Sequence, residues 1–173
     1  MSTTAMSGFS RRIAVYSPTK GSKTMRANGA EIYPGHAVTC QGETWPDVCL
    51  PDAISDSCFG IAGVPEGGDV DTVIADNDEF RVYLTGGGAI VYGFHQGAAG
   101  GGSIVAGEIL ISMGDSATGL LRPLRKGLAS LAADYTSTVL ATAITKLFAL
   151  VGRAQETHAS ATANTPIQVR LSV

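Results

Sequence analysis

The sequence predicts a mainly β protein, folded as a compact barrel or sandwich of short strands. Runs rich in Val, Ile, Tyr and Phe recur along the 173 residues, and each is bounded by Gly, Pro, Asn or Asp. In segments 80–84 and 167–171 apolar and polar side chains alternate, so one face of each strand is buried and the other is wet. Glycine-rich turns separate the runs, which is typical of all-β sandwiches and barrels.

Nine segments are expected to be strands and one to be a helix. The helix is expected over 127–135, where two leucines and an alanine share one face. The β-branched stretch 136–145 favours strand over helix, so the conformation of 125–144 stays open between the two. In chain order the expected strands are 12–17, 36–41, 58–64, 71–76, 80–84, 89–94, 108–113, 120–124 and 167–173.

Two halves of the chain resemble each other over three short segments. The first match carries an apolar pair, a turn with glycine and then a strand in both copies. The matches are short and gapped, which leaves two interpretations: a duplicated β-unit, or two stretches of β-protein with the same turn chemistry. The matched segments are 32–40 with 104–112 at an offset of 72, 59–64 with 148–153 at an offset of 89, and 80–84 with 167–171 at an offset of 87.

Charge divides the chain into an arm and a body. The first 30 residues hold five basic residues and no acid, whereas the rest holds 7 basic and 15 acidic residues. We therefore expect an extended basic N-terminal arm over 1–30 and a β-rich domain over 31–173, with 31–100 and 101–173 as its candidate halves. The arm is either a solvated terminus or a segment that lies on an acidic surface. Its candidate contact residues are Arg11, Arg12, Lys20, Lys23 and Arg26.

The composition argues against several classes of protein. Five charges over thirty residues, with no basic and aromatic pattern, give little support to nucleic-acid binding. The uncharged run after Leu84 is broken by glycines and is too polar to cross a bilayer. The N-terminus lacks the basic and apolar regions of a signal peptide. Only 16% of the residues are charged, so we expect copies of the chain or a partner to cover part of the surface.

We expect neither a metal nor a cofactor, and no enzymatic activity. Cys40, Cys49 and Cys58 lack the short ligand spacing of zinc sites, and we interpret them as reduced thiols. The three histidines belong to no nucleophile motif. The acidic run 69–79 lacks the residue order of a calcium loop and is interpreted as a solvated loop before a strand.

Two glycine clusters bracket the apolar run 89–94. A phosphate-binding loop would open a helix and hold a lysine nearby, but a strand is expected after each cluster, and no lysine lies between Arg81 and Pro123. The clusters are therefore interpreted as hairpin turns, in which a positive φ favours glycine, or as surfaces that a partner can approach closely. The glycines are Gly86, Gly87, Gly88, Gly100, Gly101 and Gly102.

Taken together, these features resemble a tailed-phage head decoration protein, also called a capsid cement protein. The resemblance is a pattern of turns and strands that spans 29–173. It departs from the family at Glu108, where Asp is commoner, and at 125–144, which has no clear counterpart. Four features carry it: the polar basic arm with the turn and strand at 29–40, the acidic-loop segment 57–84, the segment 102–124 and the closing hairpin 148–173.

The resemblance implies a structural virion protein that binds the outside of an assembled icosahedral capsid and stabilises it. The implied fold is a compact β-barrel or β-sandwich, β-tulip or SH3-like, with one short helix and the extended arm. The implied partner is the major capsid protein, and a homotrimer is the favoured oligomer. The implied location is the capsid surface of the virion, after synthesis in the host cytoplasm.

Three other interpretations stay open. The chain could be another virion component, such as a tail, spike or shell protein. A trimeric β-barrel hydrolase would need a phosphate site rich in Ser, Asp and Arg beside the glycines, and the clusters lack these neighbours. A carbohydrate-binding module would need exposed aromatic residues, and the chain has one Trp and five Tyr.

Overall fold

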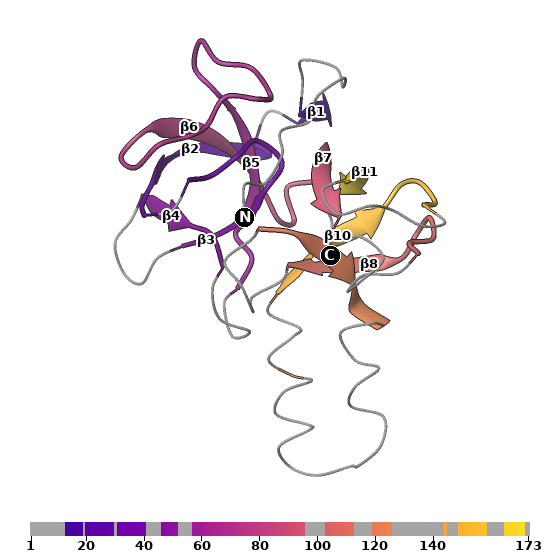
Figure 1. Cartoon of the computed structure of the whole chain (residues 1–173). Coiled ribbons are helices and arrows are strands. Elements are labelled where there is room, and N and C mark those ends of the chain that lie inside the picture. The colour runs from indigo at the N-terminus through magenta and orange to yellow at the C-terminus, as the bar shows by residue number, and fades with distance from the viewer. Residues whose placement is uncertain are drawn as a thin grey trace.

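The computed structural model contains two barrels of short strands that lie side by side (Figure 1). The earlier part of the chain forms one barrel and the later part forms the other. The protein is therefore mainly β, as the sequence predicts. The structure describes residues 13–18, 20–29, 31–40, 46–51, 57–95, 103–112, 119–125, 144, 149–158 and 165–171.

The first barrel closes in the order β2-β4-β3-β5-β6. β2 and β4 are parallel, and every other neighbouring pair is antiparallel. Because β4 is only three residues long, it pairs with β2 at Arg26 and Ala27 alone. The strands are β2 (Ser22–Ala27), β3 (Ala37–Cys40), β4 (Asp47–Cys49), β5 (Gly60–Pro65) and β6 (Glu79–Leu84).

The second barrel has the strand order β7-β11-β10-β8-β9, and a parallel pairing between β7 and β9 closes it. A sixth strand, β1 (Ala14–Tyr16), pairs antiparallel with β7 outside this circuit. The strands are β7 (Ile90–His95), β8 (Ile109–Ser112), β9 (Leu121–Pro123), β10 (Leu150–Ala154) and β11 (Thr165–Arg170).

The two barrels have the same topology and the same register. When β2–β6 are matched in order with β7–β11, every pairing in one barrel has its counterpart in the other, and the parallel pair β2–β4 corresponds to β7–β9. Arg26 pairs with Glu79, and its counterpart Phe94 pairs with Pro166. The chain therefore contains one five-stranded unit twice.

The same turn precedes β3 and β8. In turns 33–36 and 105–108 the third residue is a glycine with φ of 96° and 85° respectively, and the fourth donates its backbone N–H to the first carbonyl at 3.0 Å. The fourth side chain then accepts the N–H of the first residue, through Nδ1 of His36 at 3.3 Å and a carboxylate oxygen of Glu108 at 3.1 Å. Glycine is favoured here because a positive φ at the third position strains any other residue.

Two of the three sequence matches coincide with the structural equivalence. The offset of 72 relates β3 to β8, and the offset of 87 relates β6 to β11. The third match is displaced, because the counterpart of Gly152 is Gly60 and not Gly63. Both glycines lie where a Cβ atom would strike a carbonyl oxygen of the facing strand. The boundary between the units lies at 85–89, not at residue 100 as expected.

Each barrel has an apolar interior, and one cluster joins the two barrels. The first interior includes Met25, Ile74 and Phe80. The second cluster fills the other barrel and also takes in Ile61 and Tyr83 of the first barrel. Burial of this shared apolar surface holds the barrels together.

Phe94 lies at the junction of the two barrels. Its backbone N–H donates to the carbonyl of Gly35 at 3.3 Å, and its ring centroid is 5.5 Å from that of His36. On the same side, the Ala37 N–H donates to the carbonyl of Gly119 at 2.8 Å. Loops of each barrel therefore hydrogen-bond to the other barrel at this junction.

The main correction to the predicted fold concerns the arm. Residues 22–27 are not part of an extended arm, because they form β2 and pair along β6. Residues 14–16 likewise form β1. The prediction for 1–12 lies outside the described residues. β2 escaped prediction because only Met25 and Ala27 of its side chains are buried, so its apolar alternation is weak.

Other expectations have mixed outcomes. Segment 71–76 is not a strand, and only Ile74 forms a bridge, to Ile32. The three-residue strand β4 was not predicted. The expected helix 127–135 and the stretch 136–145, apart from Ile144, lie outside the residues that the structure describes.

Candidate functional site: a basic edge strand

Two of the basic residues predicted for an arm lie on a barrel strand, and a third lies just before it. Lys23 and Arg26 belong to β2, and Lys20 lies just before it. Lys20 and Lys23 are exposed, and β2 contains no acidic residue. Arg11 and Arg12 lie outside the described residues. The structure thus brings together three of the five candidate residues, and it makes the site a strand with regular geometry.

One side of β2 is paired along its length, and the other side is covered only at one end. Successive strand residues direct their backbone groups to opposite sides. The Ala27 N–H donates at 2.9 Å to the carbonyl that precedes β6, whereas the Arg26 N–H donates at 3.1 Å to Pro46 on the opposite side. The alternation places the backbone groups of Ser22 and Thr24 on the side of Arg26. Among the residues that the structure describes, none pairs with them there.

In the second barrel β1 covers the equivalent edge. Ser22 and Thr24 correspond to Ile90 and Tyr92 of β7. β1 pairs with β7 at Ile90 and Val91, and the Tyr92 N–H donates at 2.9 Å to the carbonyl of Ile13, just before β1. Within the described residues, the chain thus supplies one covering strand for two equivalent edges. The far side of β2 at Ser22 and Thr24, named here the β2 edge, has the geometry that accepts an added strand.

An ion pair marks the covered end of β2. The Arg26 guanidinium donates through Nε and Nη2 to the two carboxylate oxygens of Asp47, at 2.7 and 3.0 Å. This hydrogen bonding holds the pKa of Asp47 below its usual range. In the second barrel the same two positions hold Phe94 and Leu120, which are buried at the junction. The first barrel therefore has a charged pair where the second has an apolar contact.

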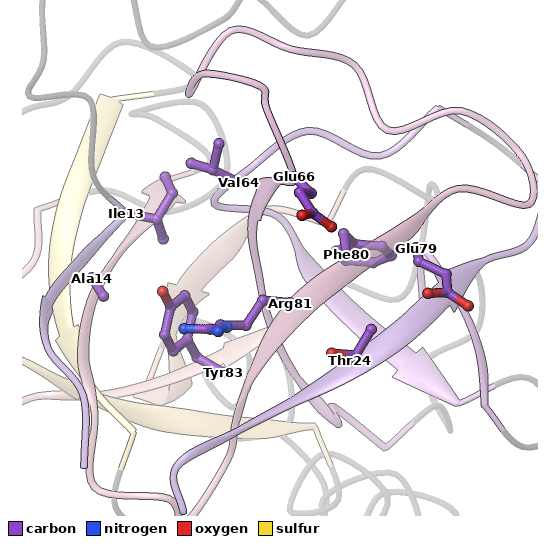
Figure 2. A pocket seen from close by; sticks show the side chains of 9 residues that line it. All are labelled: Ile13, Ala14, Thr24, Val64, Glu66, Glu79, Phe80, Arg81 and Tyr83. Atoms are coloured by element: carbon purple, nitrogen blue, oxygen red, sulfur yellow. The ribbon is translucent and has the colours of Figure 1, made fainter. Parts of the chain in front are cut away.

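A hollow of about 530 Å³ lies on the outer face of the first barrel. Figure 2 shows Ile13, just before β1, on one side of it, Thr24 and Glu79 on the other side, and Arg81 and Tyr83 of β6 between them. Its lining is mixed, with apolar, acidic and basic side chains. Ala14 of the covering strand β1 and Thr24 of the β2 edge therefore face the same space.

The second barrel lacks the side chain geometry that opens this hollow. Thr24 corresponds to Tyr92, and Arg81 corresponds to Gln168. The Gln168 amide donates to the Tyr92 hydroxyl at 2.9 Å, so the two side chains join over the surface of the second barrel. The small Thr24 leaves that space unfilled in the first barrel.

A second hollow, of about 420 Å³, lies between β2 and the turn that precedes it. Ser17 and Pro18 form its wall on the turn, and Ser22 and Thr24 contribute from β2. Its charged side chains, which belong to Lys23 and Arg81, are both basic, so the surface next to the β2 edge favours negative charge.

Two buried titratable groups, His36 and Cys58, are not among the residues that line these hollows. Burial lowers the pKa of His36 to about 4 and raises the pKa of Cys58 to about 12, so both are neutral at pH 7. A neutral, buried thiol is a poor nucleophile. Cys40, Cys49 and Cys58 form no disulfide with one another. No group of His, Cys, Asp or Glu in the described part of the chain could hold a metal ion.

The first glycine cluster links the two barrels. Gly86 and Gly88 have φ of 77° and 73°, and the Gly87 N–H donates to the Leu84 carbonyl at 3.0 Å. The cluster is therefore a turn with positive φ. It is not the hairpin that we expected, because β6 and β7 pair in different barrels. The second cluster, 100–102, lies outside the described residues.

No protein-family model matches the chain, and no curated protein matches it in sequence. In the part of the chain that the structure describes, no helix is long and apolar enough to cross a membrane. The site is therefore defined by geometry: a basic strand, its edge at Ser22 and Thr24, and the hollows beside it. Sequence reasoning found the basic residues but missed Ser22 and Thr24, whose role depends on pairing and not on side chain type.

Proposed function

We propose that the protein is a decoration protein, which binds the outside of an assembled viral capsid and stabilises it. The β2 edge carries the proposal, because a strand edge flanked by exposed lysines suits attachment to an acidic protein surface. The resemblance of the sequence to head decoration proteins suggests the rest: the major capsid protein as the partner, a homotrimer, and a place on the virion surface.

The proposed mechanism is binding that is selective for the assembled shell. A protein that binds the assembled state and not the free subunits shifts the equilibrium toward assembly. Each contact can be weak, because an oligomer with several contacts gains from a high effective concentration. A shared apolar cluster joins the two barrels, so they can hold β2 in a fixed position for such a contact.

Co-sedimentation with empty shells of the same virus tests this function. We expect the purified protein to saturate the shells at a fixed ratio per capsomer and to raise the temperature at which they rupture. The double variant Lys20→Glu with Lys23→Glu should lose binding, because it reverses the charge beside the β2 edge. A matched control, Arg153→Glu with Arg170→Glu, makes the same change of charge at exposed positions of the second barrel and should bind normally. Protein that stays in the supernatant at every stage of shell maturation would contradict the proposal.

A further inference from the structure

We propose that the β2 edge takes an extended acidic segment of a partner protein as an added strand, in the place that β1 holds on β7. The inference rests on the proposed function in taking that partner to be the shell protein. The recognition itself is a matter of backbone geometry and charge, and it can be measured without the shell.

The pairing of β1 with β7 sets the expected register. β1 runs antiparallel to β7, with Ala14 opposite Val91. Val91 corresponds to Lys23, so the added strand should place a small residue opposite Lys23. The Tyr92 N–H, which donates to the carbonyl of Ile13 just before β1, corresponds to the Thr24 N–H. The added strand should therefore run antiparallel to β2 and offer a carbonyl to Thr24.

The two equivalent edges differ in chemistry, and the difference identifies the occupant. At the covered edge β7 has Ile90 and Val91, and the strand β1 that pairs with it also has apolar side chains. At the β2 edge the counterparts are Ser22 and Lys23. The 420 Å³ hollow beside it carries only basic charge, from Lys23 and Arg81, whereas Glu79 lines the far side of the 530 Å³ hollow that Thr24 also faces. A strand with carboxylates and small polar residues complements this surface, because opposite charges across a strand pair stabilise it.

The same comparison argues against a second copy of the chain as the occupant. The strand that a second copy would lend by analogy is β1, whose free face carries the apolar side chains of Val15 and Tyr16. Arg11 and Arg12 precede it in the sequence. A strand that is apolar and preceded by basic residues does not complement the basic residues of β2.

A peptide probe tests the strand site directly. The probe is acetyl-Asp-Thr-Ala-Thr-Tyr-Asp-amide, and the control peptide replaces both aspartates by lysine. In nuclear magnetic resonance spectra of the full chain, we expect the acidic peptide to shift the Thr24 amide signal and to slow its hydrogen exchange. The Met25 amide should change little, because the alternation directs it toward β6. The lysine peptide should bind more weakly, and added salt should weaken the acidic peptide.

Two matched variants separate backbone pairing from surface charge. Thr24→Pro removes the N–H donor from the β2 edge and leaves the β6 side intact, whereas Thr24→Val keeps the donor and changes only the side chain. We expect the proline variant to raise the dissociation constant of the peptide about five- to ten-fold, the loss of roughly one hydrogen bond, and the valine variant to bind as the native chain does. Thermal unfolding checks that each variant is folded. If Thr24→Pro does not fold, Lys20→Glu with Lys23→Glu should instead reverse the preference between the two peptides.

Each remaining outcome decides between the alternatives. Equal binding by the two Thr24 variants, or preference of the native chain for the lysine peptide, would overturn the strand site. Self-association that Thr24→Pro abolishes would place a second copy at the β2 edge and would also overturn it. Peptide binding without binding to shells would leave the strand site in place and remove the capsid function. Binding to shells without peptide binding would support the capsid function and overturn the strand site.

Discussion

His36 is buried among aromatic rings at the junction of the barrels, with 1% of its surface exposed. Its ring centroid lies 5.5 Å from those of Tyr33 and Phe94. Nδ1 accepts the Tyr33 N–H, while Nε2 has no hydrogen-bond partner among the described residues. Burial of this ring disfavours its charged form and lowers its pKa from 6.5 to about 4.

We predict that the protein loses stability between pH 6.5 and pH 4 partly through His36. In this range the unfolded chain binds a proton at this residue and the folded chain does not, so the free energy of unfolding falls as the pH falls. The contribution reaches about 3 kcal/mol at the acid end. His36→Gln cannot titrate but can still accept the Tyr33 N–H, so urea unfolding of this variant should depend less on pH.

His95 supplies a comparison, because burial also lowers its pKa. Some pH dependence should therefore remain in His36→Gln. An unchanged slope of stability against pH in that variant would show that His36 does not titrate as its burial requires.

Asp47 acts at lower pH, with the usual sign for a carboxylate. Its hydrogen bonds with Arg26 lower its pKa in the folded state. The stability that it contributes is present above its unfolded pKa, about 4, and is lost as the pH falls through the lower folded value. Acid therefore weakens the covered end of β2 after it has weakened the junction at His36.

At the scale of elements, the matching strands β5 and β10 show what the duplicated unit requires. A Cβ atom at Gly60 would strike the carbonyl oxygen of Tyr83, and one at Gly152 would strike that of Arg170. The glycines therefore allow the close approach of β5 to β6 and of β10 to β11.

We predict that Gly60→Ala and Gly152→Ala destabilise the protein by similar amounts, each by about 1–3 kcal/mol, because each forces two strands apart. Chemical denaturation of both variants measures this. Asp71→Ala, at an exposed loop position, is the control and should change the stability by less than about 0.5 kcal/mol. If one alanine variant lowers the free energy of unfolding and the other does not, the two barrels are not equivalent in packing.

β2 shows where element prediction fails. Strands with alternating buried residues, such as β6 and β11, were predicted from sequence. β2 is a similar length, but Ser22, Lys23 and Thr24 give it a polar start. Its pairing partner β6 lies more than 50 residues later in the chain. Nothing local in the sequence marks β2 as a strand, so it was taken for part of an arm.

At the scale of the whole molecule, the junction couples the two barrels. Phe94 is among the largest fully buried side chains, and it belongs to the shared cluster together with several isoleucines and leucines. Because the same cluster fills the second barrel and contacts the first, loss of packing there affects both units. We expect the native protein to unfold in a single transition.

We predict that Phe94→Ala lowers the stability by about 3–5 kcal/mol and splits the unfolding of the two barrels into separate transitions. Differential scanning calorimetry measures both effects. Phe80→Ala is the matched control, because Phe80 is equally buried but lies inside the first barrel. It should cost a similar free energy and leave the junction intact. A single transition in Phe94→Ala would show that the barrels are coupled elsewhere.

The two copies of the five-stranded unit differ in whether β1 covers the strand edge, and the proposed function depends on this difference. Two equivalent edges exist, and β1 covers only that of β7. The β2 edge differs from it in backbone pairing and in charge, at Ser22, Lys23 and Thr24. Within the described residues the chain itself covers the edge of β7, and we propose that a partner covers the edge of β2.

The sequence by itself determined the features that depend on neighbouring residues. The turns at 33–36 and 105–108 are visible because a positive φ requires glycine, and β6 and β11 are visible because burial on one face imposes a period of two. Only the tertiary structure decided that 22–27 is a barrel strand, that β6 and β7 separate into two barrels, and that β1 covers one of two equivalent edges. These features arise from backbone hydrogen bonds between distant segments, and such bonds use groups that every residue but proline carries.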